Sequence, residues 1–310
     1  MQGLPRRGAP PPPTIPRRGG PPQKRALPHV ARVLAVASGK GGVGKSTVAV
    51  NLAFALAMHP RPGNARPRVG ILDLDVFGPS IPKLMALESA PEPALTDAGA
   101  LVPVVNHGLP CMSMGFLLPR PSADDPADEK PVVWRGLMVQ KAVQQLLFDV
   151  DWRDPGSAAP LDVLVVDMPP GTGDVPLTLA QLVVVDGAVV VSTPQDVALT
   201  DVRKGVAMFR KVDVPITGLL LNESHFICPS CEDRHELFGS PAAFRATAAR
   251  FGADVLGELP LVQGVSQVGD RGVPYMLSSE ADGGGSPGGK QWKETMSQVA
   301  SKVWDYLDRR

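Results

Sequence analysis

The feature that most constrains the fold is a glycine-rich segment, Gly39–Ser46, with the sequence GKGGVGKS. It fits the phosphate-binding loop pattern, in which four free positions separate a Gly from Gly-Lys-Ser. The apolar run Val33–Ala37 precedes it and predicts a buried strand, and Thr47–Met58 follows and predicts a helix with almost no polar face. Glycines let backbone N–H groups turn toward phosphate oxygens at a helix N-terminus. The sequence therefore predicts a site for a nucleoside triphosphate.

The positions within this loop have distinct predicted roles. Lys45 is expected to reach the β- and γ-phosphates, and Ser46 is expected to hold magnesium. The other residues expected to line the nucleotide are Gly39, Lys40, Gly41, Gly42, Val43, Gly44 and Thr47. A glycine-rich turn without a ligand is the alternative, and the strand–loop–helix context disfavours it.

Apolar runs recur along the 310 residues, and helical patterns separate most of them. Runs that are apolar throughout, separated by helices, indicate a parallel sheet covered on both faces. Leu101–Phe116 is an exception, because Asn106-His107-Gly108 between two short apolar runs predicts a hairpin. The predicted fold class is α/β, a P-loop NTPase with a mostly parallel twisted sheet and helices on both faces.

The sequence divides into four segments. Residues 1–29 are expected to form a disordered, basic, proline-rich leader, and residues 30–280 are expected to form the P-loop NTPase domain. Residues 281–289 read as a flexible glycine-rich linker to a final helix, residues 290–310. That helix carries an apolar stripe at helical spacing, which predicts docking on the domain: Trp292, Met296, Val299, Val303 and Leu307.

Charge and cysteine content indicate a compartment. Every charged residue before Asp73 is basic, and an acid-free, Arg-rich N-terminus is typical of a mitochondrial transit peptide. Pro10–Pro13 forbids a regular amphipathic helix there, however, so a disordered polyproline arm fits equally well. Three cysteines are too few for a disulfide framework, which indicates a reducing compartment. We expect the mitochondrial matrix, with the cytoplasm as the alternative and no stable membrane span.

Carboxylates follow two further predicted strands. Asp73 and Asp75 end the run that begins at Val69, and Asp167 ends the run that begins at Val163. The carboxyl ends of parallel strands form the crevice where such sheets bind ligands. Asp167 is therefore expected to support magnesium, through water. For each aspartate alone, a helix N-cap is the alternative.

With its additional lysine, Lys40–Ser46 resembles the deviant phosphate loop of MinD-like ATPases. The resemblance implies that Lys40 reaches the nucleotide of a partner subunit and that Asp75 orients the attacking water, with a swap of roles between Asp75 and Asp73 left open. It also implies that ATP closes a face-to-face homodimer and that hydrolysis loosens it. We expect this hydrolysis to be slow. Asn222 matches a position that helps to recognise adenine, and a simple strand-end turn is its alternative.

Cys228-Pro-Ser-Cys231 is the second chemical motif, and four interpretations compete for it. A redox pair is disfavoured because two acidic residues follow and raise thiol pKa values. A zinc site with His225 and His235 places four ligands within eleven residues, which is tight for a tetrahedron. Structural cysteines without metal are a third possibility. An iron–sulfur cluster commonly takes four thiolates, which two copies of the pair across a two-fold axis would supply.

A MinD-like core with Asn-x5-Cys-Pro-x-Cys resembles the Mrp-type iron–sulfur carrier ATPases over nearly all of Val30–Leu307. The resemblance implies a labile, dimer-bridging [4Fe–4S] cluster on Cys228 and Cys231, handed to client apoproteins. Gly3-Leu4-Pro5 and Val132–Val139 look like the mitochondrial branch that serves respiratory complex I, so complex I subunits are the expected clients. Little sequence precedes Gly-Leu-Pro, where that branch carries its transit peptide.

Two other classes share the phosphate loop. A positioning ATPase acting on membrane or DNA has no need of the cysteine pair, and no nucleic-acid partner is expected here. A nitrogenase-reductase-like electron donor takes its cluster ligands from two separated loops per subunit, whereas this chain has one adjacent pair. Cys111 is expected to be a buried apolar thiol. Trp134 and Arg135 could contact a client or pack on the core.

Overall fold

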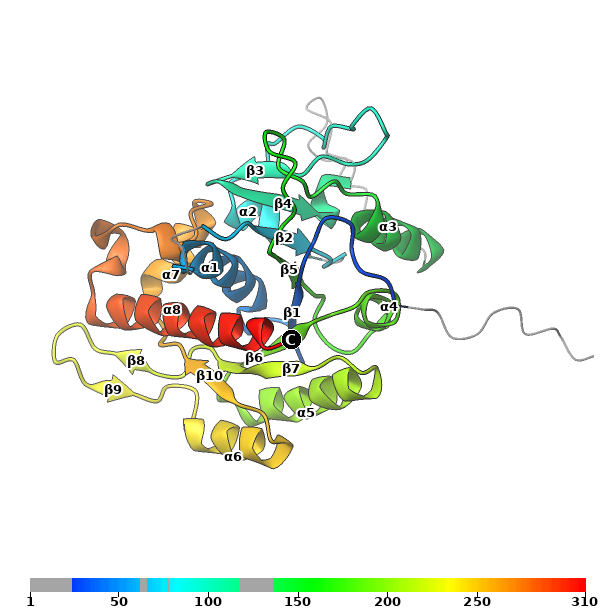
Figure 1. Cartoon of the computed structure of the whole chain (residues 1–310). Helices are drawn as coiled ribbons and strands as arrows, with labels where there is room; N and C mark the ends of the chain where they lie inside the picture. Colours follow the sequence, from blue (N-terminus) through cyan, green and yellow to red (C-terminus); the bar gives the residue numbers. More distant parts are fainter. Residues whose placement is uncertain (1–23, 62–65, 77, 118–135) are drawn as a thin grey trace, which may run out of the picture.

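The computed structural model describes residues 24–61, 66–76, 78–117 and 136–310. An eight-stranded sheet forms its centre, in the order β10-β7-β6-β1-β5-β2-β4-β3, and every neighbouring pair except β3–β4 is parallel (Figure 1). The strands are β1 (Val33–Ser38), β2 (Val69–Asp73), β3 (Val104–Asn106), β4 (Leu109–Ser113), β5 (Val163–Asp167), β6 (Gly187–Ser192), β7 (Ile216–Leu221) and β10 (Val255–Glu258). A separate hairpin consists of β8 (Phe226–Ile227) and β9 (Arg234–His235). The predicted α/β class is confirmed.

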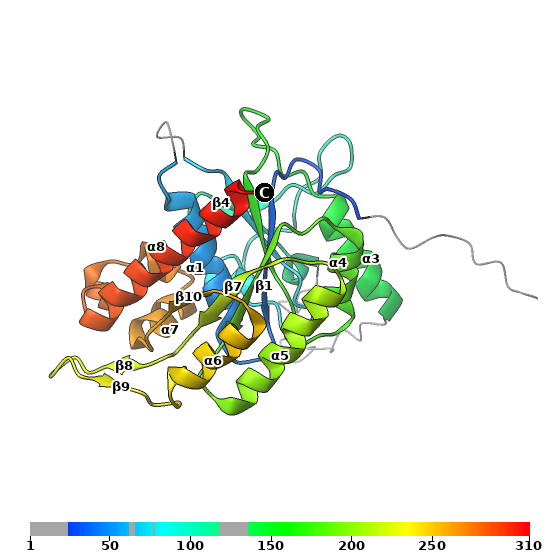
Figure 2. The same ribbon diagram turned by 60° about the horizontal axis from the view of Figure 1, so that its bottom comes forward.

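Helices cover both faces of the sheet. One face carries α1, α7 and α8, and the other carries α3, α4, α5 and α6 (Figures 1 and 2). Because β1, β2, β5 and β6 lie between the two layers, every one of their residues is buried, which explains why each is apolar up to the Ser or Asp that ends it. The helices are α1 (Lys45–Met58), α2 (Ile81–Leu84), α3 (Gly136–Phe148), α4 (Asp174–Leu182), α5 (Asp196–Lys211), α6 (Pro241–Phe251), α7 (Gln263–Asp270) and α8 (Pro287–Asp308).

The predicted hairpin around Asn106-His107-Gly108 is present as the antiparallel pair β3–β4. His107 and Gly108 both have positive φ, 51° and 80°, as a type I′ turn requires. The second strand ends at Ser113, earlier than the apolar run suggests, because Met114–Leu117 turns into a 3₁₀ helix.

The N-terminal boundary of the domain lies before the expected Val30. Backbone hydrogen bonds join Arg25 to Leu182 and Val184, at 2.8 and 2.9 Å, and Leu27 is buried in the core. Residues 24–29 of the predicted disordered leader therefore contact the domain, through an isolated parallel bridge between Arg25 and Val183 and through the buried Leu27. The rest of the leader lies outside the described residues.

The glycine-rich segment 281–289 is not a flexible linker, which corrects the sequence-based expectation. A π-helical turn (Glu280–Gly284) and the first turn of α8 occupy it, and Tyr275 Oη donates to the Gly283 carbonyl at 3.0 Å. A Cβ on Gly289 would lie 2.3 Å from that carbonyl oxygen. The glycines allow close packing, and α8 starts at Pro287 rather than at residue 290.

The C-terminal helix docks as its pattern predicts. All five residues of its apolar stripe are buried, and α8 packs along α1. None of the helices in the described part of the chain is long and apolar enough to cross a bilayer.

Candidate functional site

The candidate site lies where the parallel strands β1, β2, β5, β6 and β7 end. The phosphate loop leaves β1 and enters α1, as predicted, and Gly42 and Gly44 have φ of 78° and 75°. These backbone conformations favour glycine and turn successive N–H groups toward one side of the loop. The loop therefore has the geometry of an anion-binding site at the start of a helix.

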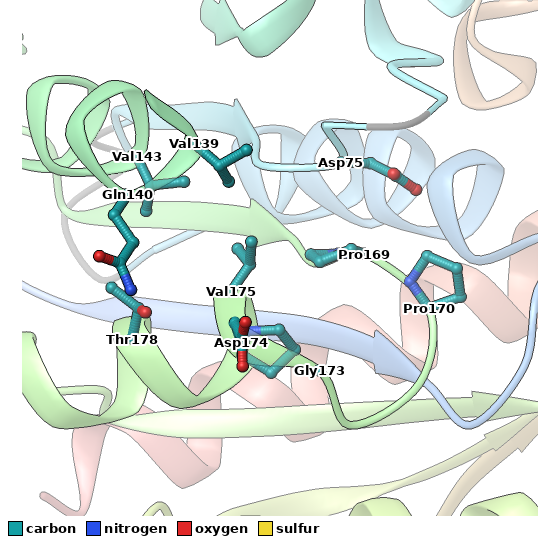
Figure 3. Close-up of a pocket in the computed structure, with 11 residues that line it drawn as sticks. Asp75, Val139, Gln140, Val143, Pro169, Pro170, Gly173, Asp174, Val175 and Thr178 are labelled. Atoms are coloured by element: carbon teal, nitrogen blue, oxygen red, sulfur yellow. The ribbon is translucent and has the colours of Figure 1, made fainter. Parts of the chain in front are cut away.

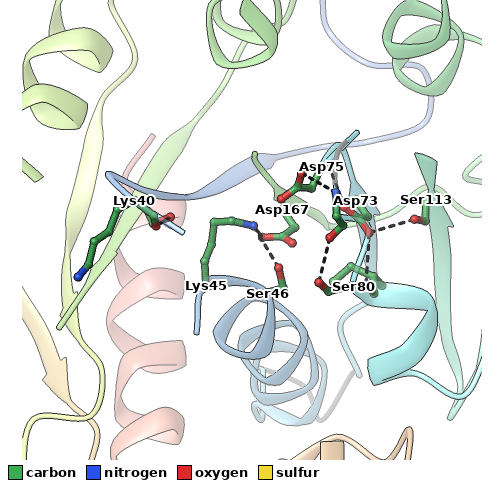
Figure 4. Close-up of polar contacts among 11 residues, drawn as sticks. Lys40, Lys45, Ser46, Asp73, Asp75, Ser80, Ser113 and Asp167 are labelled. Atoms are coloured by element: carbon green, nitrogen blue, oxygen red, sulfur yellow. Dashed lines mark hydrogen bonds and ion pairs between the residues drawn. The ribbon is translucent and has the colours of Figure 1, made fainter. Parts of the chain in front are cut away.

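Lys45 and Asp167 meet at the base of this loop. Lys45 Nζ lies 2.5 Å from Asp167 Oδ1 and 3.1 Å from Ser46 Oγ (Figure 4). Burial raises the pKa of Asp167, and the charge of Lys45 opposes that shift. The second carboxylate oxygen, Oδ2, is buried and has no hydrogen-bond partner. A free buried carboxylate oxygen near a serine hydroxyl is a donor set that suits hydrated magnesium.

Asp73 stabilises the loop that follows β2. Its carboxylate accepts hydrogen bonds from the amides of Asp75 (2.9 Å) and Ile81 (3.3 Å) and from the Ser113 hydroxyl (3.0 Å). Complete burial, together with the nearby charge of Asp167, raises the pKa of Asp73 to about 7. A carboxylate enclosed by three donors from its own chain holds the loop in place and is not available to a water molecule.

Asp75 occupies a more open position two residues further on. It accepts a hydrogen bond from the Gly78 amide at 3.3 Å and lies at the edge of a cavity of about 270 Å³ (Figure 3). The other walls of this cavity come from α3, α4 and the segment Pro169-Pro170 that follows β5. Of the two aspartates that the sequence left interchangeable, Asp75 is the one that borders an open space.

Lys40 is held within its own chain. Its Nζ donates to Gln195 Oε1 at 2.8 Å, and its carbonyl accepts from the Ser38 hydroxyl at 2.8 Å. Gln195 was missed by sequence reasoning. It follows β6 at the same sheet edge, so the rule that pointed to Asp73 and Asp167 could also have found it.

Asn222 forms part of the support of the phosphate loop. Its side-chain amide donates to the Val43 carbonyl at 3.0 Å and lies against Gly44. It also borders a cavity of about 280 Å³ whose other walls include Thr47 and Pro260–Val262. This cavity adjoins the phosphate loop at Gly42 and Gly44, and adenine recognition by Asn222 stays a prediction.

Cys228 and Cys231 lie on the tight turn that joins β8 to β9. The Cys228 amide donates to the Asp233 carbonyl at 3.0 Å, and the Glu232 amide donates to the Cys228 carbonyl at 2.9 Å. Backbone N–H groups of Cys231 and Ser230 lower the pKa of Cys228. The Asp233 amide lowers the pKa of Cys231, but hydrogen bonds with the Cys228 thiol and the Asp233 carboxylate outweigh it, and the pKa is raised.

This geometry argues against two of the four interpretations of the cysteine pair. Within the described residues, no three His, Cys, Asp or Glu side chains converge to hold a metal ion. His225 is buried, with its Nδ1 2.7 Å from the Ser224 hydroxyl, while His235 is exposed. The single-chain zinc site is therefore not formed. A redox pair would open a helix, whereas this pair lies in a hairpin turn.

The comparison with protein families decides the classification. Residues 29–303 match the model of the ParA group described as the NUBPL iron-transfer P-loop NTPase. The chain belongs to this family. The match covers the phosphate loop, both aspartate segments and the cysteine turn, so the family assignment and the site geometry concern the same residues.

Relatives in this family are similar over most of their length. The mouse "iron-sulfur cluster transfer protein NUBPL" is 46% identical over 91% of this chain and 80% of its own. The Arabidopsis thaliana "iron-sulfur protein required for NADH dehydrogenase, mitochondrial" is 46% identical over 82% of this chain and 74% of its own. The Aquifex aeolicus "iron-sulfur cluster carrier protein" is 43% identical over 82% of this chain and 64% of its own.

Solved structures confirm the fold. A nucleotide-binding protein from Archaeoglobus fulgidus, in complex with ADP, has a TM-score of 0.62 and 34% identity, covering 79% of this chain and 87% of its own. The cell-division ATPase MinD of Pyrococcus furiosus has a TM-score of 0.57 and 18% identity, covering 89% and 99%. The second likeness concerns the fold alone.

The sequence also singled out Cys111, Trp134 and Arg135. Cys111 is a buried thiol in β4, as predicted, and burial raises its pKa well above the ordinary value. Trp134 and Arg135 lie outside the described residues.

Proposed function

We propose that this protein is an ATP-dependent iron–sulfur carrier that binds a [4Fe–4S] cluster between two copies of itself and delivers it to apoproteins. The observation that carries the proposal is the placement of Cys228 and Cys231 on an exposed turn, with no third ligand from the described part of the chain. Two thiolates per chain complete a four-thiolate set only when a second copy supplies the other two.

One residue that supports the phosphate loop lies close to the cysteines along the chain. Only five residues separate Asn222, which contacts the phosphate loop, from Cys228. A change in the position of the loop would therefore reach the cysteine turn through a short segment. This supports ATP as the ligand that controls the cluster.

We assign the chemistry of hydrolysis to the groups at the sheet edge. Lys45 exchanges Asp167 for the β- and γ-phosphates, and Ser46 with Asp167 would hold magnesium, which neutralises phosphate charge when bound. Asp75 orients the attacking water from its place at the cavity edge. Lys40 leaves Gln195 and contacts the nucleotide of the second copy. Hydrolysis is slow, because a carrier requires a timed change of shape more than rapid turnover.

The clients we propose are iron–sulfur apoproteins, and in a mitochondrion these include subunits of respiratory complex I. The acid-free basic leader and the mitochondrial relative from Arabidopsis thaliana support a matrix location. The bacterial relatives described as carriers support the same activity in the cytoplasm.

Anaerobic reconstitution tests the cluster proposal. We expect about four irons per dimer by metal analysis, since each cluster takes four thiolates. Cys228→Ala and Cys231→Ala should each lose the iron, whereas Cys111→Ala, which alters a buried thiol on β4, should retain it. One zinc per monomer with no cluster would contradict the proposal.

Cluster transfer tests the role of the nucleotide. A loaded wild-type protein should convert an apo-client to its holo form in an ATP-dependent manner, and Lys45→Ala should bind no nucleotide and lose that dependence. Equal transfer rates with and without ATP would remove the nucleotide from the mechanism and leave the cluster proposal intact.

A further inference from the structure

The cysteine turn belongs to a segment that the rest of the chain does not cover. Pro229–Ser240 is an unbroken run of exposed residues, and it projects from the body of the molecule with β8 and β9 (Figures 1 and 2). Only two residue pairs, Phe226–His235 and Ile227–Arg234, join the two strands of this hairpin. A two-stranded hairpin is at best marginally stable in water on its own.

This segment presents large apolar side chains to solvent. Leu237 is 57% exposed and Phe238 is 37% exposed, directly after β9. Val197, at the start of α5, is 68% exposed. A Cβ on Gly239 would lie 3.9 Å from the Pro194 carbonyl oxygen, so the loop after β9 lies beside the loop that leads into α5. We call Val197, Leu237 and Phe238 the hairpin patch.

The hairpin patch adjoins both chemical sites. Leu237 lies six residues after Cys231 on the same exposed segment, and Val197 lies two residues after Gln195, which holds Lys40. Single exposed apolar residues are ordinary, but a cluster beside a functional site indicates an interaction surface.

Ion pairs hold the hairpin patch in a defined position. Glu258 on β10 accepts from Arg245 on α6 at 2.6 Å and lies 3.4 Å from Arg234 on β9. Both ends of the segment that carries Leu237 and Phe238 are thereby tied to the sheet edge. A surface that is ordered before binding loses less conformational entropy on association.

We propose that the hairpin patch is the surface on which a second copy of this chain docks. The inference rests on the proposed function, in which the cysteine ligand set is incomplete without that copy. A two-fold axis that brings two cysteine turns together must pass beside the turns. In such an isologous interface each patch faces the same region of the other copy. The apolar patch then forms the core of the contact and the arginines around Glu258 form its polar rim.

A charge-introducing double variant, Leu237→Asp with Phe238→Asp, tests this surface. After anaerobic reconstitution, light scattering and iron analysis should show dimerisation weakened by about tenfold or more, because apolar residues at an interface core dominate affinity. Binding of a fluorescent ATP analogue should remain within about twofold of the wild type, since the phosphate loop is untouched. Val105→Asp, at a similarly exposed position (57%) on β3 at the far edge of the sheet, is the matched control and should behave as the wild type.

Photo-crosslinking gives a second measurement that does not depend on the charged variant. The photoreactive residue p-benzoylphenylalanine at position 238 should yield covalent dimers in cluster-loaded protein, and the same residue at position 105 should not. A dimeric, cluster-loaded double variant, or a dimer without crosslinks from position 238, would overturn the docking surface alone. A wild-type protein that binds no cluster would overturn the proposed function on which it rests.

Discussion

Lys45 and Asp167 form an ion pair beneath the phosphate loop, with Lys45 7% exposed and Asp167 fully buried. The sheet fixes this relationship, because Asp167 ends β5 directly opposite Val36 of β1, and the loop continues from β1. The ammonium therefore stabilises a pocket that also contains the buried Asp73. The same lysine that is proposed to bind phosphate contributes to the folding of the site.

Lys45→Met should destabilise the protein in a pH-dependent manner. The pKa of Asp167 is already raised by burial, so its contribution to stability falls as pH rises from its ordinary value through the folded one. Removing the Lys45 ammonium raises the pKa of Asp167 further, so stability continues to fall at higher pH than in the wild type. We expect Lys45→Met to lower the free energy of unfolding by about 3–5 kcal/mol at pH 8. This loss should exceed the loss at pH 6 by up to about 2.7 kcal/mol.

Chemical denaturation of the two proteins at pH 6 and pH 8 measures this effect. Lys45→Arg is the control, since it keeps a positive charge near Asp167, and it should show little pH dependence relative to the wild type. An equal loss of stability for Lys45→Met at both pH values would contradict the assignment of the ion pair.

Gln195→Ala should favour the proposed dimer. Gln195 holds Lys40 Nζ at 2.8 Å within its own chain, and this hydrogen bond must break before Lys40 reaches a second copy. Loss of a hydrogen bond of about 0.5–1.5 kcal/mol should lower the ATP concentration for half-maximal dimerisation by about two- to tenfold. Sedimentation at a series of ATP concentrations measures the shift. Lys40→Ala is the comparison, and it should prevent dimerisation without preventing nucleotide binding. If Gln195→Ala leaves the ATP concentration for half-maximal dimerisation unchanged, Gln195 does not restrain Lys40.

The sequence was sufficient for the features that depend on local pattern. The strand–loop–helix around Gly39–Ser46, the parallel sheet, the β3–β4 hairpin and the buried stripe of α8 follow from periodicity, turn residues and the position of carboxylates after strands. These features are determined by neighbours along the chain.

Other features depend on which distant segments come together. The sequence could not pair Lys40 with Gln195, because 155 positions separate them. It also could not show that Gly289 packs on the Gly283 carbonyl, since a glycine run has the same composition whether it is flexible or tightly packed. The hairpin patch was missed for a related reason: apolar residues next to a strand read as core until the structure shows them exposed.

Gly289→Ala should destabilise the C-terminal helix. The new methyl group would lie 2.3 Å from the Gly283 carbonyl oxygen and 2.5 Å from Tyr275 Oη, so the first turn of α8 must shift. We expect a loss of about 1–3 kcal/mol, as for other overpacked sites, measured by urea unfolding. Gly205→Ala is the matched control: it lies inside α5 with no neighbour within 4 Å of the new Cβ, and it should stabilise by about 0.5–1 kcal/mol. A stabilising effect at Gly289 would restore the interpretation of residues 281–289 as a flexible linker.

Glu258→Gln should loosen the cysteine hairpin without affecting the nucleotide site. Arg245 lowers the pKa of Glu258 most strongly, and Arg234 on β9 adds to the shift, so the carboxylate is stabilised in the folded protein. That stability is present above the ordinary glutamate pKa and is lost as pH falls through the lowered one. At pH 7 we expect the free energy of unfolding to fall by about 1 kcal/mol and amide exchange over residues 226–235 to become faster. The difference in stability from the wild type should shrink near pH 4.

Hydrogen–deuterium exchange and urea unfolding at both pH values measure the two effects. Glu294→Gln, on the exposed side of α8, should change neither. If exchange in the hairpin is unaltered while global stability falls, Glu258 stabilises α6 and does not position the cysteines.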